Sequence, residues 1–118
     1  MLRAFHPFLK VAEGAQVYCM TSRVGGEQAR AYWGAYATSK AAFEMLAQTY
    51  AEENAALKIA VTIVDPGAMR TDMRAQAMPG EDAETLPPAQ DLAPLINQLI
   101  DQGMDAPRRI EFRNWQNA

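Results

Sequence analysis

The chain of 118 residues carries three short segments that could together form a site for proton transfer to or from a ligand. Tyr36 and Lys40 are four residues apart, so on a helix they lie on one face about one turn apart. An ammonium group close to a phenol stabilises the phenolate, which makes a phenol more effective in general acid–base catalysis near neutral pH. Ser22 follows one strand-like stretch and Pro66-Gly67 follows another, so each stands at the end of a strand.

The spacing of Tyr36 and Lys40 is weak evidence by itself, because a half-buried tyrosine and a solvated lysine can share it without a function. The neighbouring segments strengthen the interpretation. In open parallel sheets, ligands bind outside the carboxyl ends of the strands. We therefore expect Ser22, Tyr36 and Pro66-Gly67 to face one crevice.

The segments that must position these side chains alternate between helical and strand patterns. We expect the helix 35–53 to be buried on two sides, against a sheet and against another helix, because its apolar residues cover more than one stripe. The alternation predicts an α/β fold with a parallel sheet. The predicted elements are helices at 1–12, 35–53 and 90–102, strands at 15–21, 58–64 and 109–112, and a lid loop at 65–88 with one helical turn around 71–77.

These motifs, in this order, resemble the short-chain dehydrogenase/reductase family up to about residue 105. Residues 20–25 are similar to the family's serine segment, and residues 65–71 to its Pro-Gly-x-x-x-Thr segment. Residues 33–36 and 69–75 resemble most the YciK-type oxidoreductases within the family. The resemblance implies NAD(P)-dependent hydride transfer between a nicotinamide cofactor and a small carbonyl or alcohol substrate.

The resemblance also implies a role for each matching residue. Ser22 would hydrogen-bond the substrate oxygen, Tyr36 would be the catalytic acid/base, and Lys40 would assist Tyr36 and contact the nicotinamide ribose. The backbone near the glycine and the threonine hydroxyl would hold the nicotinamide carboxamide or the diphosphate. The cofactor-binding residues that the resemblance implies are thus Tyr36, Lys40, Pro66, Gly67 and Thr71.

The glycines do not form a diphosphate-binding loop, because no two of them stand in a Gly-x-Gly pattern. The resemblance therefore predicts the C-terminal catalytic part of a Rossmann-like doubly wound parallel sheet, as a single partial domain over 1–118, without the N-terminal dinucleotide-binding half. The cofactor of the parent enzyme would be NAD or NADP. The residue that chooses between them is not expected in this chain.

Composition limits the other partners. A net charge of −3 argues against a nucleic-acid partner. The absence of an apolar run of about 18 residues argues against a membrane span, so we expect a cytoplasmic protein. Cys19 is the single cysteine and is expected to be a buried thiol in a reducing compartment. His6 is the single histidine, so neither a His-based metal site nor a Ser-His-Asp triad is predicted.

Two alternatives to catalysis stay open at the sequence level. The chain could be a non-catalytic, truncated half-domain that binds no cofactor and self-associates. The resemblance implies a homo-oligomer in which the helix 35–53 pairs with its copy. Alternatively, the chain could be an unrelated small α/β binding module. In the lid loop, Arg70 and Arg74 could bind an anionic group of a substrate or cofactor or could be solvated. Met69, Met73 and Met78 could form an adaptable apolar surface over a substrate or could pack under the lid.

Overall fold

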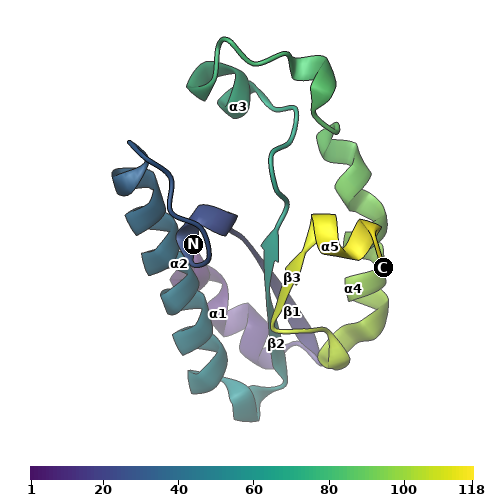
Figure 1. Ribbon diagram of the computed structural model, residues 1–118. Helices are drawn as coiled ribbons and strands as arrows, with labels where there is room; N and C mark the ends of the chain where they lie inside the picture. Colours follow the sequence, from purple (N-terminus) through teal and green to yellow (C-terminus); the bar gives the residue numbers. More distant parts are fainter.

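The computed structural model describes residues 1–118 and contains a three-stranded parallel sheet with helices on both faces (Figure 1). The strands are β1 (Ala15–Met20), β2 (Ile59–Asp65) and β3 (Arg109–Glu111), and β2 lies between the other two. β1 pairs with β2 along its whole length, whereas β3 pairs only with the last part of β2. The α/β fold class predicted from the sequence is confirmed.

Five helices accompany the sheet. Helices α1 and α2 pack on one face, and α4 and α5 pack on the other. None of the helices combines the length and apolar character that crossing a bilayer requires. The helices are α1 (Leu2–Val11), α2 (Gly34–Glu53), α3 (Asp72–Ala77), α4 (Ala93–Gln102) and α5 (Phe112–Gln116).

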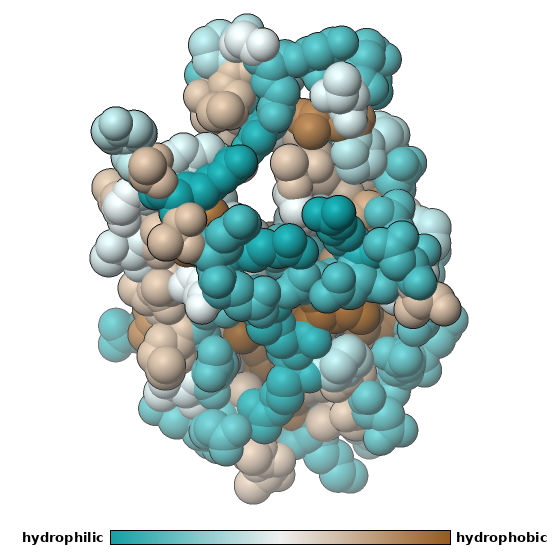
Figure 2. Space-filling model, viewed as in Figure 1, coloured by the Kyte–Doolittle hydropathy of each residue, from teal (hydrophilic) through white to brown (hydrophobic).

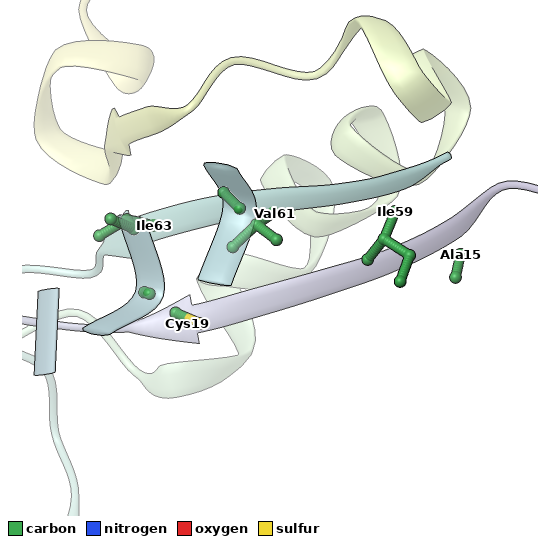
Figure 3. Close-up of a cluster of buried hydrophobic side chains, with 7 residues drawn as sticks. Ala15, Cys19, Ile59, Val61 and Ile63 are labelled. Carbon is green, nitrogen blue, oxygen red and sulfur yellow. The ribbon is translucent and has the colours of Figure 1, made fainter. Parts of the chain in front are cut away.

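The core forms around β2 because this strand is covered on both faces. Its β-branched side chains alternate between the two faces, as the pleat of a strand requires. Figure 3 shows Ile59, Val61 and Ile63 beside Cys19 of β1, on the face covered by α2. Val64 points to the opposite face and packs against α4. Burial raises the pKa of the Cys19 thiol, as expected for a cysteine enclosed by apolar side chains.

Two parts of the fold differ from the sequence prediction. The last strand ends at Glu111, and Phe112, which was expected to belong to it, begins the unpredicted helix α5 and is buried against α4. A strand of three residues is too short to show the alternation on which a prediction relies. Helix α2 was also expected to be buried on two sides. Met45 and Leu46 on its outer face are 61% and 66% exposed, so this prediction is wrong for that face.

Residues 66–88, called the lid below, extend away from the sheet and include α3 (Figure 1). The radius of gyration is 15.4 Å, compared with about 13.5 Å for a compact domain of this length. The two ends of the lid are joined by a backbone hydrogen bond of 2.9 Å, which the Arg70 N–H donates to the carbonyl oxygen of Pro87. The molecule therefore consists of a sheet-and-helix body and a projecting segment above the carboxyl ends of β1 and β2.

Candidate active site

A cleft of about 650 Å³ lies between the body and the lid, at the carboxyl ends of β1 and β2. In the space-filling view the molecule is open below the segment that contains α3 (Figure 2). Volumes of this size are typical of small-molecule sites. The structure brings all the site residues predicted from the sequence to the lining of this one cleft, namely Ser22, Tyr36, Lys40, Pro66, Gly67 and Thr71.

Helix α2 positions the phenol and the ammonium group. Tyr36 lies in the first turn of α2 and Lys40 one turn later, on the same face. The Lys40 Nζ atom lies 5.8 Å from the centroid of the Tyr36 ring. It also donates a long hydrogen bond of 3.5 Å to the carbonyl oxygen of Met20, the last residue of β1. The lysine therefore connects the tyrosine to the end of the strand that precedes Ser22.

A close backbone contact holds the segment of Ser22 against α2. Ser22 is followed by a 3₁₀ turn, Arg23–Gly25, which packs on the helix. A Cβ atom at Gly25 would lie 2.8 Å from Lys40 Cβ and 3.0 Å from the Lys40 carbonyl carbon. These distances are too short for any side chain, so glycine is required for the turn to approach α2 this closely. The turn thereby fixes Ser22 relative to Tyr36 and Lys40.

The Pro66-Gly67 turn is shaped by the last residue of β2. The buried Asp65 accepts a hydrogen bond of 2.9 Å from the Gly67 N–H at its Oδ1 atom. Gly67 has a φ of +71°, in the left-handed region that glycine adopts without strain. In this conformation the N–H of Gly67 has its partner inside the chain. A cofactor amide would therefore need another donor from this turn.

Thr71 begins the helix of the lid. Its Oγ1 atom accepts a hydrogen bond of 3.2 Å from the backbone N–H of Arg74, which is an N-cap interaction. The hydroxyl proton is not used by this bond. Thr71 can therefore still donate a hydrogen bond into the cleft while it caps α3.

A buried carboxylate beside the cleft was missed at the sequence level. Glu44 follows Lys40 by one further turn of α2 and is only 6% exposed. It accepts a hydrogen bond of 2.6 Å from the Thr21 hydroxyl and lies 3.5 Å from Arg109 Nε. Because Thr21 precedes Ser22, this contact fixes the end of β1 to α2. The four-residue step from Lys40 to Glu44 indicates a shared face of α2 but not the burial of Glu44, which depends on Thr21 and Arg109.

Arg109 joins Glu44 to a wider charged cluster, defined here as Arg23, Glu27, Glu44, Arg109 and Glu111. Arg109 Nη1 lies 2.8 Å from Glu27 and 3.0 Å from Glu111, while Arg23 donates to Glu111 at 2.7 Å. A hydrogen bond between the two carboxyl groups raises the pKa of Glu27 and lowers that of Glu111. The cluster therefore ties the turn that follows Ser22 to α2 and to β3.

Trp33 connects the site to the lid. Its ring meets the ring of Tyr36 edge-on, with the centroids 5.7 Å apart and the planes at 88°. The guanidinium carbon of Arg74, on α3, lies 5.9 Å from the Trp33 ring, and Arg74 Nε donates to Glu81 at 2.7 Å. The Arg74 guanidinium lowers the pKa of the Glu81 carboxyl. The lid thus contacts the body through Trp33 and Arg74 as well as through Met69, near its start, which is buried in the core cluster with Val64 and Leu95.

The donors of the cleft fit the nicotinamide end of a dinucleotide. They include the hydroxyl groups of Ser22, Tyr36 and Thr71 and the ammonium group of Lys40. A nicotinamide riboside offers ribose hydroxyl groups and a carboxamide, which these groups can bind. The arrangement also leaves the hydroxyls of Ser22 and Tyr36 free for the oxygen of a substrate.

Comparison with known proteins identifies the family. The model of the short-chain dehydrogenase family matches residues 1–82. The chain belongs to the short-chain dehydrogenase/reductase family. It is 38% identical, over 109 residues, to the uncharacterised oxidoreductase YciK of Escherichia coli K12, covering 92% of this chain and 42% of YciK. The resemblance to the family and to YciK that the motifs indicated is confirmed.

Solved structures of this family share the fold. The structure of YciK from E. coli is 35% identical, with a TM-score of 0.83, and the match covers 93% of this chain and 45% of YciK. A short-chain dehydrogenase from Shigella flexneri complexed with NADP is 36% identical, with a TM-score of 0.81, and the match covers 93% of this chain and 46% of that one. A short-chain dehydrogenase from E. coli CFT073 complexed with NADPH is 36% identical, with a TM-score of 0.79, and the match covers 92% of this chain and 45% of that one.

The chain spans just under half the length of these relatives. The three-stranded parallel sheet is accordingly a part of the Rossmann-like fold of the short-chain dehydrogenases. The family match at residues 1–82 does not by itself assign the chain to either half of the relatives.

Proposed function

We propose that the chain carries the catalytic centre of an NAD(P)-dependent oxidoreductase that interconverts a carbonyl group and an alcohol. The observation that carries this proposal is the meeting of Ser22, Tyr36 and Lys40 with the Pro66-Gly67 turn in one cleft at the strand ends. Strand ends are the usual ligand sites of open parallel sheets. The family membership and the order of the motifs support the same conclusion.

In the direction of reduction, the Ser22 hydroxyl donates a hydrogen bond to the carbonyl oxygen and holds it beside Tyr36. A reduced nicotinamide bound in the cleft supplies the hydride that the carbonyl carbon accepts. Tyr36 gives its proton to the oxygen, so the product is the alcohol. The ammonium group of Lys40, 5.8 Å from the Tyr36 ring, stabilises the negative charge left on the phenol oxygen. Oxidation of the alcohol follows the same steps in reverse.

The cofactor is proposed to be a phosphorylated nicotinamide dinucleotide, because two relatives were solved with NADP and NADPH. In this proposal Lys40 contacts the nicotinamide ribose and Thr71 the carboxamide or diphosphate. The chain would correspond to the C-terminal, catalytic part of the relatives, since the serine, Tyr-x-x-x-Lys and Pro-Gly motifs occur in the family's order. The substrate would be a small carbonyl or alcohol compound.

Binding of the cofactor is the first test. Titration with NADPH and with NADH, monitored by the fluorescence of Trp33, should give saturable quenching because Trp33 lines the cleft. Preference for NADPH would agree with the proposal. A folded chain that quenches with neither nucleotide would show that the 118 residues do not form a dinucleotide site alone.

Replacement of the phenol is the second test. Tyr36→Phe should lower hydride transfer to a panel of aldehydes and ketones by about 10² to 10⁴, the usual contribution of a general acid. Tyr32→Phe is the matched control, because Tyr32 is fully exposed and outside the cleft. Equal rates for the Tyr36→Phe variant and the unmodified chain would refute the role of Tyr36.

A second candidate function, a self-associating half-domain without catalysis, is favoured by the exposed apolar face of α2. Met45 and Leu46 lie on this face, 61% and 66% exposed, and apolar patches of this kind often mark interfaces. In this proposal α2 pairs with α2 of a second copy. Sedimentation should then show a dimer that Leu46→Lys dissociates, and a stable monomer at micromolar concentration would exclude it.

A further inference from the structure

The cleft carries a positive charge although the chain as a whole is negative, with a net charge of −3. A cleft whose lining has an excess of one sign of charge raises the local concentration of ligands of the opposite sign. The lining holds five cationic side chains and two carboxylates. The cations are Arg23, Arg30, Lys40, Arg74 and Arg113, and the carboxylates are Asp65 and Glu81.

Most of these cations already have a partner or a role. Arg23 pairs with Glu111 at 2.7 Å and Arg74 with Glu81 at 2.7 Å. Lys40 stands beside Tyr36. Arg30 and Arg113 form no ion pair within the chain. These two guanidinium groups are therefore the ones available to an anionic ligand.

Arg30 is the cation beside the tyrosine that forms no ion pair, although its charge helps to lower the pKa of Glu81 in the lid. Its guanidinium carbon lies 4.8 Å from the centroid of the Trp33 ring, and that ring lies 5.7 Å from the ring of Tyr36. The sum of the two distances is the largest separation possible between the Arg30 guanidinium carbon and the Tyr36 ring centroid. A ligand with one aromatic ring and a substituent at each end is therefore long enough to reach from Tyr36 to Arg30.

Arg30 lies on the substrate side of Tyr36 in the proposed function. Along α2, Lys40 follows Tyr36 by one turn and is the proposed contact of the nicotinamide ribose, whereas Trp33 precedes Tyr36. Arg113 belongs to α5, which packs on the opposite face of the sheet from α2. Trp33 and the lid residue Met73 supply apolar surface in the cleft.

We propose that the substrate is a carbonyl compound with a distal carboxylate, whose carboxylate is bound by Arg30 at the Trp33 end of the cleft. This inference rests on the proposed function and defines its substrate class. The carboxylate takes no part in the reaction: the carbonyl carbon gains the hydride, its oxygen gains the proton of Tyr36, and the carboxylate stays ionised. Its role is to fix the distance of the carbonyl group from Tyr36.

The test uses 4-acetylbenzoate and its neutral methyl ester as matched probes. Nuclear magnetic resonance resolves the indole N–H signals of Trp33 and Trp115 in one sample, without any need for turnover. Trp33 lines the cleft, while the Trp115 indole donates to Gln98 at 2.8 Å outside it and serves as an internal control. The Trp33 signal should shift saturably with the acid and at least about tenfold more weakly with the ester.

Variants identify the cation. Arg30→Gln should weaken binding of the acid about tenfold and leave binding of the ester unchanged. Arg108→Gln is the matched control, because Arg108 is outside the cleft and pairs with Glu52 on the surface. Unchanged affinity of Arg30→Gln for the acid, or loss of the acid preference in Arg113→Gln instead, would overturn the assignment to Arg30.

Hydride transfer from NADPH separates this inference from the proposed function. Preferred binding of the acid without turnover would leave the anion site standing and count against the oxidoreductase activity. Turnover of acid and ester with equal kcat/KM would support the activity and overturn the anion site. Turnover with a higher KM for the ester, and a KM for the acid that rises in Arg30→Gln, is the expected result.

Discussion

The body and the lid hold their shape by different means. In the body, Val64, Leu95 and Leu99 are completely buried. The start of the lid is held by Met69, which is buried in the core cluster. Beyond Met69 the lid depends mainly on the ion pairs of Arg74 with Glu81 and of Arg70 with Glu84, together with one backbone bond to Pro87. Segments with few buried contacts open at low free-energy cost. We therefore expect Tyr36 and Lys40, the groups proposed for proton transfer, to be held in place before a ligand arrives, whereas the lid over them can adjust to the ligand.

The largest contrast should come from removing apolar contacts in each region. Leu95→Ala leaves a cavity in the body and should lower the free energy of unfolding by about 3 to 5 kcal/mol. Met73→Ala removes a side chain of the lid that is 68% exposed, so its effect should stay within about 0.5 kcal/mol. Urea unfolding monitored by circular dichroism measures both. Equal losses for the two variants would contradict the division into a buried body and a weakly held lid.

The charged cluster tests whether the body also depends on polar contacts. Arg109→Met should cost about 3 kcal/mol, because it leaves the buried Glu44 without its guanidinium partner. The double variant with Glu44→Gln should recover part of this loss, since no buried charge then remains without a partner. Urea unfolding of the two single variants and the double variant forms a double-mutant cycle. Strictly additive losses would mean that the pair contributes no coupling.

The contact of Gly25 with α2 tests how the body positions Ser22. Gly25→Ala forces a methyl group to within 2.8 Å of Lys40 Cβ and should cost about 1 to 3 kcal/mol. Gly26→Ala is a close control, because a Cβ there would approach nothing nearer than Glu44 Oε2 at 3.5 Å. We expect Gly25→Ala to lower kcat more than it raises KM. A change in KM alone would mean that the turn does not set the position of Ser22 relative to Tyr36.

The smallest effect should come from the lid ion pair. Arg74→Gln should accelerate amide hydrogen exchange in α3 by less than about tenfold, because partly exposed ion pairs contribute little. Exchange in β2 should not change. The pKa of Glu81 is lower in the folded state than in the unfolded chain. The contribution of this pair is therefore complete above the unfolded pKa and is lost as the pH falls through the folded pKa. Acid should consequently loosen the lid of the unmodified chain more than that of the variant, in which only Arg30 still lowers the pKa of Glu81.

The sequence could predict the central parts of this molecule because their signals are local. The β-branched run at 58–64 predicts β2, and the four-residue step from Tyr36 to Lys40 predicts a shared helix face. The strand ends then bring Ser22 and Pro66-Gly67 to the same edge of the sheet. The roles of these residues in catalysis stay predictions.

The charged cluster could not be predicted, because it depends on which segments meet in space. Glu44 looks like an ordinary solvated residue of a helix until Arg109, far away in the chain, is placed next to it by the pairing of β3 with β2. Strand β3 and helix α5 are too short to show a periodic pattern in the sequence. Similarly, exposure of Met45 and Leu46 follows from packing and not from composition.

The single thiol of the chain has a practical consequence. Cys19 is enclosed between β1 and α2, on the face of the sheet away from α4. An alkylating reagent can reach its sulfur only when α2 separates from β1, so the rate of modification measures how often the body opens. Movements of the lid leave this rate unchanged. A ligand that slows alkylation must therefore stabilise the body itself, whereas one that only orders the lid would leave the thiol as reactive as before.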